Sequence, residues 1–211
     1  MQIKGISAYV IKRLPRYYRF LGDLSAAGIK RISSGELAKR MGLTASQIRQ
    51  DLNCFGGFGQ QGYGYNTDIL REEIGNILGI NNTKKIIVIG MGNLGKAITQ
   101  HVNFNDKGFS LIGLFDEKES LVGNIVRNIP IRNTNQLDEF CKENHPDAAV
   151  LCIPKEAVYP IAEHLIRLGV KGFLNFSHYD LALNFEGIAV ENIHFGDDLM
   201  KLSYKIKNLD K

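Results

Sequence analysis

Residues 84–95 constrain the fold more than any other segment, and they read KKIIVIGMGNLG. A run of β-branched residues passes directly into Gly90-x-Gly92-x-x-Gly95, which is typical of a strand, a tight turn and a helix. Gly90 permits the turn, Gly92 lets the backbone approach a pyrophosphate, and Gly95 lets the helix lie close to the strand. The pattern predicts a dinucleotide held at a helix N-terminus; an ordinary strand-to-helix turn is the alternative.

A second strand, residues 109–115 (FSLIGLF), follows that helix and leads into Asp116. The order of strand, turn, helix, strand and acid fits within the roughly 30 residues that a βαβ unit needs. A carboxylate at this point accepts hydrogen bonds from the adenosine ribose and repels a 2′-phosphate, which favours NAD+ and NADH over their phosphorylated forms. A solvated loop carboxylate is the other interpretation of Asp116.

Composition restricts the class of protein. At 211 residues the chain is long enough for two modest domains or one large one. Cys54, Cys141 and Cys152 are far apart and lack ligand spacing, so we expect a reducing compartment with neither a disulfide framework nor a zinc site. The sequence shows no signal peptide, no apolar run near the roughly 20 residues of a membrane span and no histidine metal motif. We expect a cytoplasmic protein without metal or membrane partners.

Charge is distributed unevenly. Residues 1–80 hold 11 Lys and Arg against 6 Asp and Glu, whereas the rest of the chain holds 15 against 16. A basic small domain joined to a neutral nucleotide-binding domain is what a ligand-controlled DNA-binding protein requires.

Residues 33–55 predict two short helices around Gly42. Ser33 with Glu36, and Thr44 with Gln47, each have the spacing of a capping box. In the second helix Ile48, Leu52 and Phe55 form an apolar stripe, which leaves a polar outer face. Arg, Gln and Asn are the side chains that match base edges in the major groove, although an ordinary polar helix face is the alternative. The outer-face residues are Ser46, Gln47, Arg49, Gln50 and Asn53.

The segments on either side complete a winged helix. Residues 56–65 (GGFGQQGYGY) have the glycine density of a hairpin, so we expect a wing that brings Gln60, Gln61 and Tyr63 to the DNA. A first helix over residues 7–27 carries Arg13 and Arg16, which we expect at phosphates. A helix over residues 68–78 links the two domains.

Beyond Asp116 the pattern alternates between helices at 135–143 and 156–168 and strands at 148–153, 172–176 and 188–193, which predicts a doubly wound parallel sheet. Pro154 and Phe176 follow strands at the edge where ligands bind, although Pro154 is equally a simple strand terminator. The expected cofactor contacts are Gly90, Met91, Gly92, Asn93, Leu94, Gly95, Asp116, Lys118, Pro154 and Phe176.

The last segment has a narrow apolar seam with heptad-like spacing. Its members are Phe195, Leu199, Leu202, Ile206 and Leu209. By spacing alone this is a helix packed on its own domain.

Four segments together resemble one family. The stretches KRLPRYYRFL, TASQIRQDLNCFGGFGQQGYGY, VIGMGNLG and VENIHF occur in the order found in the redox-sensing transcriptional repressors called Rex. The resemblance covers nearly the whole chain. It implies a homodimer that binds a palindromic operator through winged helices and releases it when NADH binds the Rossmann-like domains. It also implies that the C-terminal helix is exchanged across the dimer. The implied domains are 1–80 for DNA, 81–193 for NAD(H) and 194–211 for dimerisation.

The chain departs from the family at several positions. Relatives commonly carry basic wing residues where this chain has Gln60 and Gln61. His101 and His194 stand where some relatives have tyrosine and aspartate involved in coupling the nucleotide to domain rotation. We therefore name both histidines as coupling candidates; two uncoupled histidines are the alternative.

Two other functions remain open. An NAD-dependent dehydrogenase would need a catalytic acid, base or nucleophile beside the nicotinamide, normally supplied by a substrate domain for which the chain has no room. A CoA- or nucleotide-binding ligase subunit would leave the basic winged helix unexplained. We therefore expect a repressor with no catalytic residues.

Overall fold

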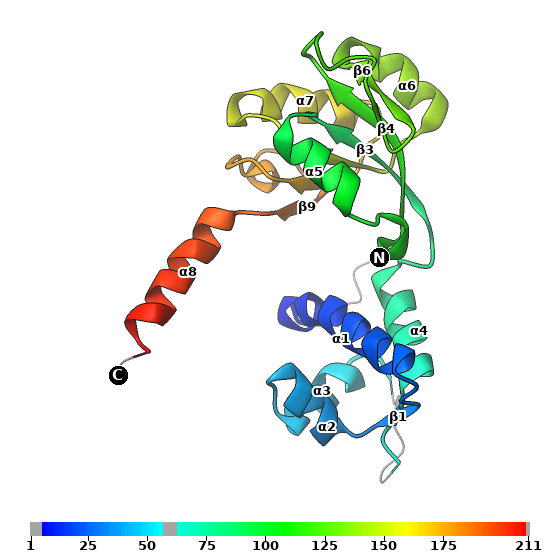
Figure 1. Ribbon diagram of the computed structural model, residues 1–211, viewed down its shortest axis with the longest axis vertical. Helices are drawn as coiled ribbons and strands as arrows, with labels where there is room; N and C mark the ends of the chain where they lie inside the picture. The colour runs from blue at the N-terminus through cyan, green and yellow to red at the C-terminus, as the bar shows by residue number, and fades with distance from the viewer. Residues whose placement is uncertain (1–5, 57–62, 210–211) are drawn as a thin grey trace. The chain divides into compact units, whose positions relative to one another are not determined.

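The computed structural model describes residues 6–56 and 63–209. The chain divides into two compact units, residues 1–82 and residues 83–211, which can be followed by colour in Figure 1. Each unit has its own buried apolar cluster, as expected for separately formed cores.

The N-terminal unit is mainly helical. Its elements are α1 (Ala8–Ala26), β1 (Arg31–Ile32), α2 (Ser34–Met41), α3 (Ala45–Asn53), β2 (Tyr65–Asn66) and α4 (Thr67–Leu78). Leu14, Leu21 and Ile74 are fully buried between α1 and α4, and Ile48 and Leu52 bury the inner face of α3 against them. This packing confirms the apolar stripe predicted for the second short helix.

The predicted helix ends are confirmed. The hydroxyl of Ser33 accepts a hydrogen bond from the backbone N–H of Glu36, and Thr44 accepts one from Gln47, both at 3.1 Å. Gly42 closes α2 in the left-handed conformation with φ 64°. The second half of each capping box is not formed among the described residues, since neither Glu36 nor Gln47 accepts a hydrogen bond from the N–H of its cap residue; the amide of Gln47 donates to Asp51.

The wing is described only at its base. Residues 57–62, with Gln60 and Gln61, lie outside the described residues. Strand β2 pairs antiparallel with β1, so the partner of Tyr65 is Ile32, which precedes α2 in the chain. The glycine-rich segment alone does not reveal this partner.

The C-terminal unit is an α/β sandwich. Its strands are β3 (Lys84–Ile89), β4 (Phe109–Asp116), β5 (Ile125–Val126), β6 (Ile129–Asn133), β7 (Ala148–Leu151), β8 (Gly172–Asn175) and β9 (Ala189–Asn192). Its helices are α5 (Asn93–His101), α6 (Leu137–Asn144), α7 (Lys155–Arg167) and α8 (Phe195–Lys207). The sheet order is β5-β6-β4-β3-β7-β8-β9, with every pair parallel except β5 with β6. The predicted doubly wound α/β fold is confirmed.

Alternate residues of β3 face opposite sides of this sheet. Ile86 and Val88 pack in the cluster that includes Ile98 of α5, whereas Ile87 and Ile89 pack with residues of α6 and α7. Both faces are therefore covered, which explains why β3 reads as a continuous apolar run. Figure 1 shows α5 on one side of the sheet and α6 and α7 on the other.

The hairpin β5–β6 was not predicted. It lies between Asp116 and residue 135, where the sequence patterns indicated no strand. Its two-residue turn, Arg127 and Asn128, has positive φ at both positions, as in a type I′ turn. One strand has only two residues and the other contains Pro130, so neither gives a usable alternating pattern.

No residue of α8 is buried. The predicted seam is exposed along its length: Phe195 by 63%, Leu199 by 66%, Leu202 by 51%, Ile206 by 55% and Leu209 by 78%. The simple expectation from spacing, a helix packed on its own domain, is therefore wrong.

Candidate functional site

The glycine turn after β3 has the geometry that its sequence predicts. Gly90 adopts φ 91°, and its N–H donates to the carbonyl oxygen of Phe115 at 2.8 Å. A Cβ atom at Gly90 would lie 2.5 Å from the carbonyl oxygen of Cys152. A Cβ at Gly95 would collide with the carbonyl oxygen of Gly90. Side chains are therefore excluded at both positions, because strand, turn and helix touch through their backbones.

Gly92 differs from the other two glycines. No described atom lies within 4 Å of a Cβ built there, and Gly92 precedes α5 without a side-chain hydrogen bond to cap the helix. The open space and the uncapped N–H groups together form a cradle for an anion at the positive end of the helix. A pyrophosphate fits this cradle, and a side chain at position 92 would fill it.

Asp116 ends β4 beside this turn. Its Oδ2 accepts a hydrogen bond from the N–H of Met91 at 2.6 Å, and its Oδ1 accepts one from the N–H of Lys118 at 2.8 Å. A carboxylate oxygen has two acceptor sites, so each oxygen can accept a further hydrogen bond from a hydroxyl group. The carboxylate both fixes the glycine turn and offers acceptors for a ribose.

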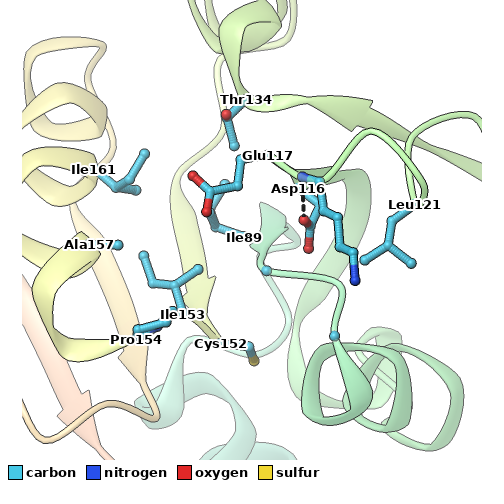
Figure 2. A pocket seen from close by; sticks show the side chains of 13 residues that line it. Ile89, Asp116, Glu117, Leu121, Thr134, Cys152, Ile153, Pro154, Ala157 and Ile161 are labelled. Atoms are coloured by element: carbon cyan, nitrogen blue, oxygen red, sulfur yellow. Dashed lines mark hydrogen bonds between the residues drawn. The ribbon is translucent and has the colours of Figure 1, made fainter.

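A pocket of about 330 Å³ opens at the carboxyl ends of β3, β4 and β7. Figure 2 shows Ala157 and Ile161 of α7 across the pocket from Asp116 and Leu121. One wall is therefore apolar and the other carries charge. The lining residues are Ile89, Gly90, Gly92, Asp116, Glu117, Lys118, Leu121, Thr134, Cys152, Ile153, Pro154, Ala157 and Ile161.

The pocket thiol is not an activated nucleophile. Burial raises the pKa of Cys152 to about 12, so the group is protonated at neutral pH, and a thiol in that state reacts poorly. The charged lining residues, Asp116, Glu117 and Lys118, all come from the end of β4. This arrangement is suited to binding a polar ligand beside an apolar surface.

The predicted cofactor residues fall into three groups. Those that line the pocket are Gly90, Gly92, Asp116, Lys118 and Pro154. Met91 is fully buried, and Gly95 is buried against the backbone of Gly90. Asn93 and Leu94 are exposed at the start of α5. Phe176 is absent from the described lining, and its ring lies 6.4 Å from that of Phe195.

Several lining residues were not predicted. Glu117 and Ile153 come just after predicted strands, so the rule that ligands bind at the carboxyl edge of a parallel sheet could have identified them, whereas Thr134 follows β6, which was not predicted. Ala157 and Ile161 lie one helical turn apart on α7. Only the packing of α7 on the sheet brings them to the pocket.

The outer face of α3 is exposed as predicted at four of its five polar positions. Those positions are Ser46, Arg49, Gln50 and Asn53. Arg49 donates a hydrogen bond to the hydroxyl of Ser34 in α2 at 3.1 Å. Gln47 is instead half-buried, with its amide held by Asp51.

The expected DNA contacts outside α3 have different surroundings. Arg13 forms an ion pair with Asp51, whose side chain is fully buried. Arg16 is exposed, and its guanidinium lies 5.5 Å from the centre of the Phe20 ring. Tyr63 is 69% exposed at the base of the wing.

The coupling candidates lie in different places. His101 ends α5 and is exposed. His194 is half-buried before α8, where its Nε2 lies 3.2 Å from the carbonyl oxygen of Ser177 and its ring centre lies 5.3 Å from that of His178. The structure thus brings His194 to His178.

Two kinds of feature are absent from the described residues. No helix in this part of the chain is long and apolar enough to cross a membrane. Within the same residues, no group of three or more His, Cys, Asp or Glu side chains is placed to hold a metal ion.

Comparison with known proteins covers both units. The family model described as "Putative DNA-binding protein N-terminus" matches residues 5–53, and the model described as "CoA binding domain" matches residues 81–179. Among solved structures, RSP in complex with beta-NAD+ and operator DNA is 44% identical with a TM-score of 0.90, covering 97% of this chain and 94% of that one. RSP in complex with beta-NADH is 40% identical with a TM-score of 0.89, covering 98% and 97%.

Curated relatives match over nearly their whole length. The redox-sensing transcriptional repressor Rex of Caldicellulosiruptor saccharolyticus is 48% identical over 96% of this chain and 92% of its own. The repressor of the same name from Clostridioides difficile is 46% identical over 97% of both chains. The chain therefore belongs to the Rex family of redox-sensing transcriptional repressors.

Proposed function

We propose that this chain is a redox-sensing transcriptional repressor that binds palindromic operator DNA as a homodimer and releases it when NADH binds. The observation that carries the proposal is the presence, in one chain, of a capped helix-turn-helix and a dinucleotide cradle. Relatives named for redox-sensing repression, and a related structure that holds both NAD+ and operator DNA, support it. On this proposal residues 1–80 bind DNA, residues 81–193 bind NAD(H) and residues 194–211 form the dimerisation helix.

The pocket supplies a physical basis for redox discrimination. Its N–H cradle at Gly92 holds a pyrophosphate, and Asp116 accepts the ribose hydroxyls and disfavours a 2′-phosphate. Ile153, Pro154 and Ala157 form an apolar surface, which penalises the positively charged ring of NAD+ through desolvation. The reduced, neutral ring escapes this penalty, so NADH binds more tightly.

The DNA surface is centred on α3. Its exposed polar residues read base edges in the major groove, and Arg49 is the central reader. Arg16 and the wing contact phosphates and set the register of the helix on the duplex. The remaining contacts that we propose are Arg13, Ser46, Gln47, Gln50, Asn53, Gln60, Gln61 and Tyr63.

The exposed seam of α8 needs an apolar partner. A contiguous row of exposed large apolar side chains marks an interaction surface. We propose that α8 is exchanged with a second copy of the chain. NADH then shifts the dimer to a geometry that no longer matches the operator, with His101 and His194 as coupling candidates.

The relatives are named as repressors and not for a reaction. We propose that this chain also regulates without catalysis and works in the cytoplasm. The protonated thiol of Cys152 supports the first statement, because it leaves the described pocket lining without a thiolate nucleophile.

The test is a fluorescence-polarisation titration of a labelled palindromic duplex selected by the wild-type protein from a random pool. NADH should release the duplex at concentrations where NAD+, NADPH and CoA do not. Release by CoA alone would favour a CoA-binding function over this one. A protein that selects no duplex is not a repressor of this kind, and turnover of NADH with a carbonyl substrate would indicate a dehydrogenase.

A further inference from the structure

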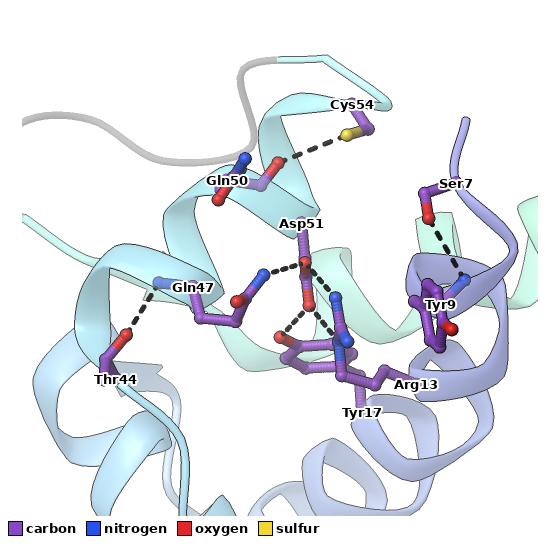
Figure 3. Close-up of polar contacts among 9 residues, drawn as sticks. All are labelled: Ser7, Tyr9, Arg13, Tyr17, Thr44, Gln47, Gln50, Asp51 and Cys54. Carbon is purple, nitrogen blue, oxygen red and sulfur yellow. Dashed lines mark hydrogen bonds and ion pairs between the residues drawn. The ribbon is translucent and has the colours of Figure 1, made fainter. Parts of the chain in front are cut away.

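The carboxylate of Asp51 is fully buried in α3 and accepts four hydrogen bonds (Figure 3). Its Oδ2 accepts from Nε of Arg13 at 2.6 Å and from the hydroxyl of Tyr17 at 2.9 Å. Its Oδ1 accepts from Nη2 of Arg13 at 2.7 Å and from Nε2 of Gln47 at 2.8 Å. All four acceptor sites of the carboxylate are therefore used.

The donors come from two helices that meet at this point. Arg13 and Tyr17 are one turn apart on α1, and Gln47 and Asp51 are one turn apart on α3, so each pair shares a helix face. Burial raises the pKa of Asp51, but the hydrogen bonds from Arg13, Gln47 and Tyr17 outweigh it and hold the pKa below its ordinary value. The carboxylate is thus ionised at neutral pH and joins α1 to α3 through directed bonds.

Arg13 has one bound edge and one open edge. Its Nε and Nη2 bind Asp51, but within the described part of the chain no group accepts a hydrogen bond from Nη1. The side chain of Arg13 keeps 26% of its surface exposed, whereas that of Asp51 keeps none. A guanidinium fixed along one edge presents its remaining N–H groups in a set direction, with less rotamer entropy left to lose on binding an anion.

Building on the repressor function proposed above, we propose that Arg13 is a buttressed phosphate contact. Asp51 holds one edge of its guanidinium while Nη1 donates to a phosphate of the operator duplex. The buried Asp51, which cannot touch DNA, then positions both the arginine and the recognition helix.

A phosphate is the ligand that this placement favours. Arg13 lies on α1, whereas the proposed base-reading side chains lie on α3. Contacts from outside the reading helix go mainly to the sugar-phosphate backbone of the DNA. Arg16, which lies about one turn along the same face of α1, is also exposed and adds positive charge beside Arg13. The ion pair between Arg13 and Asp51 would therefore link a contact with the DNA backbone to the position of α3 on the duplex.

The test measures affinity for the selected palindromic duplex at several salt concentrations. Arg13→Gln should lower the affinity by roughly tenfold or more. It should also reduce the slope of log affinity against log salt by about 0.9 for each lost phosphate contact, or about two for a dimer with two copies of Arg13. Lys142→Gln, which removes an exposed charge from α6, is the matched control and should change neither quantity.

The coupling to Asp51 is tested by a double-variant cycle. Asp51→Asn should lower the affinity although it removes no positive charge, and combining it with Arg13→Gln should add little further loss. If Asp51→Asn does not fold, Tyr17→Phe takes its place, because it removes one hydrogen bond and keeps the ring. Circular dichroism and NADH binding report whether each variant is folded.

An Arg13→Gln variant with the wild-type salt slope would overturn the phosphate contact, and fully additive losses would overturn the buttress. Either result can occur while the wild-type protein still binds the duplex and releases it with NADH, so the repressor function would stand. A wild-type protein that binds no duplex would instead remove the function on which this proposal rests.

Discussion

At the scale of single residues, the three glycines of the pocket turn have separate physical roles. Gly90 and Gly95 are required by backbone contacts within the protein, whereas Gly92 faces open space. Gly95→Ala should therefore destabilise the C-terminal unit by about 1–3 kcal/mol, because the backbone must move to admit a methyl group. Gly92→Ala should leave stability nearly unchanged but lower NADH affinity by roughly tenfold, or about 1.4 kcal/mol. Thermal denaturation and calorimetric NADH titration separate the two effects.

Gly35→Ala in α2 is the control for the glycine variants, because the nearest atom to its new Cβ, the hydroxyl oxygen of Ser33, is 3.8 Å away. Gly35→Ala should leave NADH affinity unchanged. If Gly92→Ala binds NADH as the wild type does, the pyrophosphate does not occupy the cradle at the start of α5.

At the scale of elements, the proposed dimer depends on the exposed seam of α8. Leu199 and Leu202 are 66% and 51% exposed, and burying each leucine against a second copy is worth about 1.5–3 kcal/mol. The double variant Leu199→Glu with Leu202→Glu should therefore shift the dimer towards monomer at micromolar concentration, since a charge cannot be buried without a partner. Sedimentation equilibrium gives the dissociation constant directly.

Lys201→Glu introduces the same side chain on another face of α8 and should leave the dissociation constant within about twofold of the wild type, since its exposed pair with Asp198 contributes little. A double leucine variant that stays a dimer of wild-type strength would show that the seam is not the dimer interface.

At the scale of the whole molecule, the proposed function requires that the DNA-binding surface of one unit and the nucleotide pocket of the other report on one equilibrium. Linkage is reciprocal, so the factor by which NADH lowers operator affinity must equal the factor by which the operator lowers NADH affinity. We expect a factor of roughly 5–150 in both directions, the usual range for coupled sites. Titrating NADH with and without saturating duplex, and duplex with and without NADH, measures both factors.

NAD+ provides the internal comparison in that experiment, because it occupies the same cradle but is expected to couple more weakly. Equal NADH affinity with and without the duplex would mean that the two sites are not coupled, even if each binds its ligand.

Local sequence rules predicted the features that depend on neighbouring residues. The caps at Ser33 and Thr44, the left-handed Gly42 and the glycine turn at Gly90 all follow from steric and hydrogen-bonding demands within a few positions. The doubly wound class of the sheet followed from alternating strand and helix patterns, whereas the β5–β6 hairpin at its edge did not. The sequence by itself therefore determined the fold class and the turn that forms the cradle.

Tertiary structure alone decided which side chains meet. Gln47 and Arg13 have the residue types of DNA contacts, but the fully buried Asp51 binds both, and no local pattern places an acid of α3 against α1. The apolar wall at Ile161 likewise exists only because α7 packs over the sheet end. Propensity and capping act over one or two helical turns, whereas the directions of side chains from separate helices are set by the packing of the core between them.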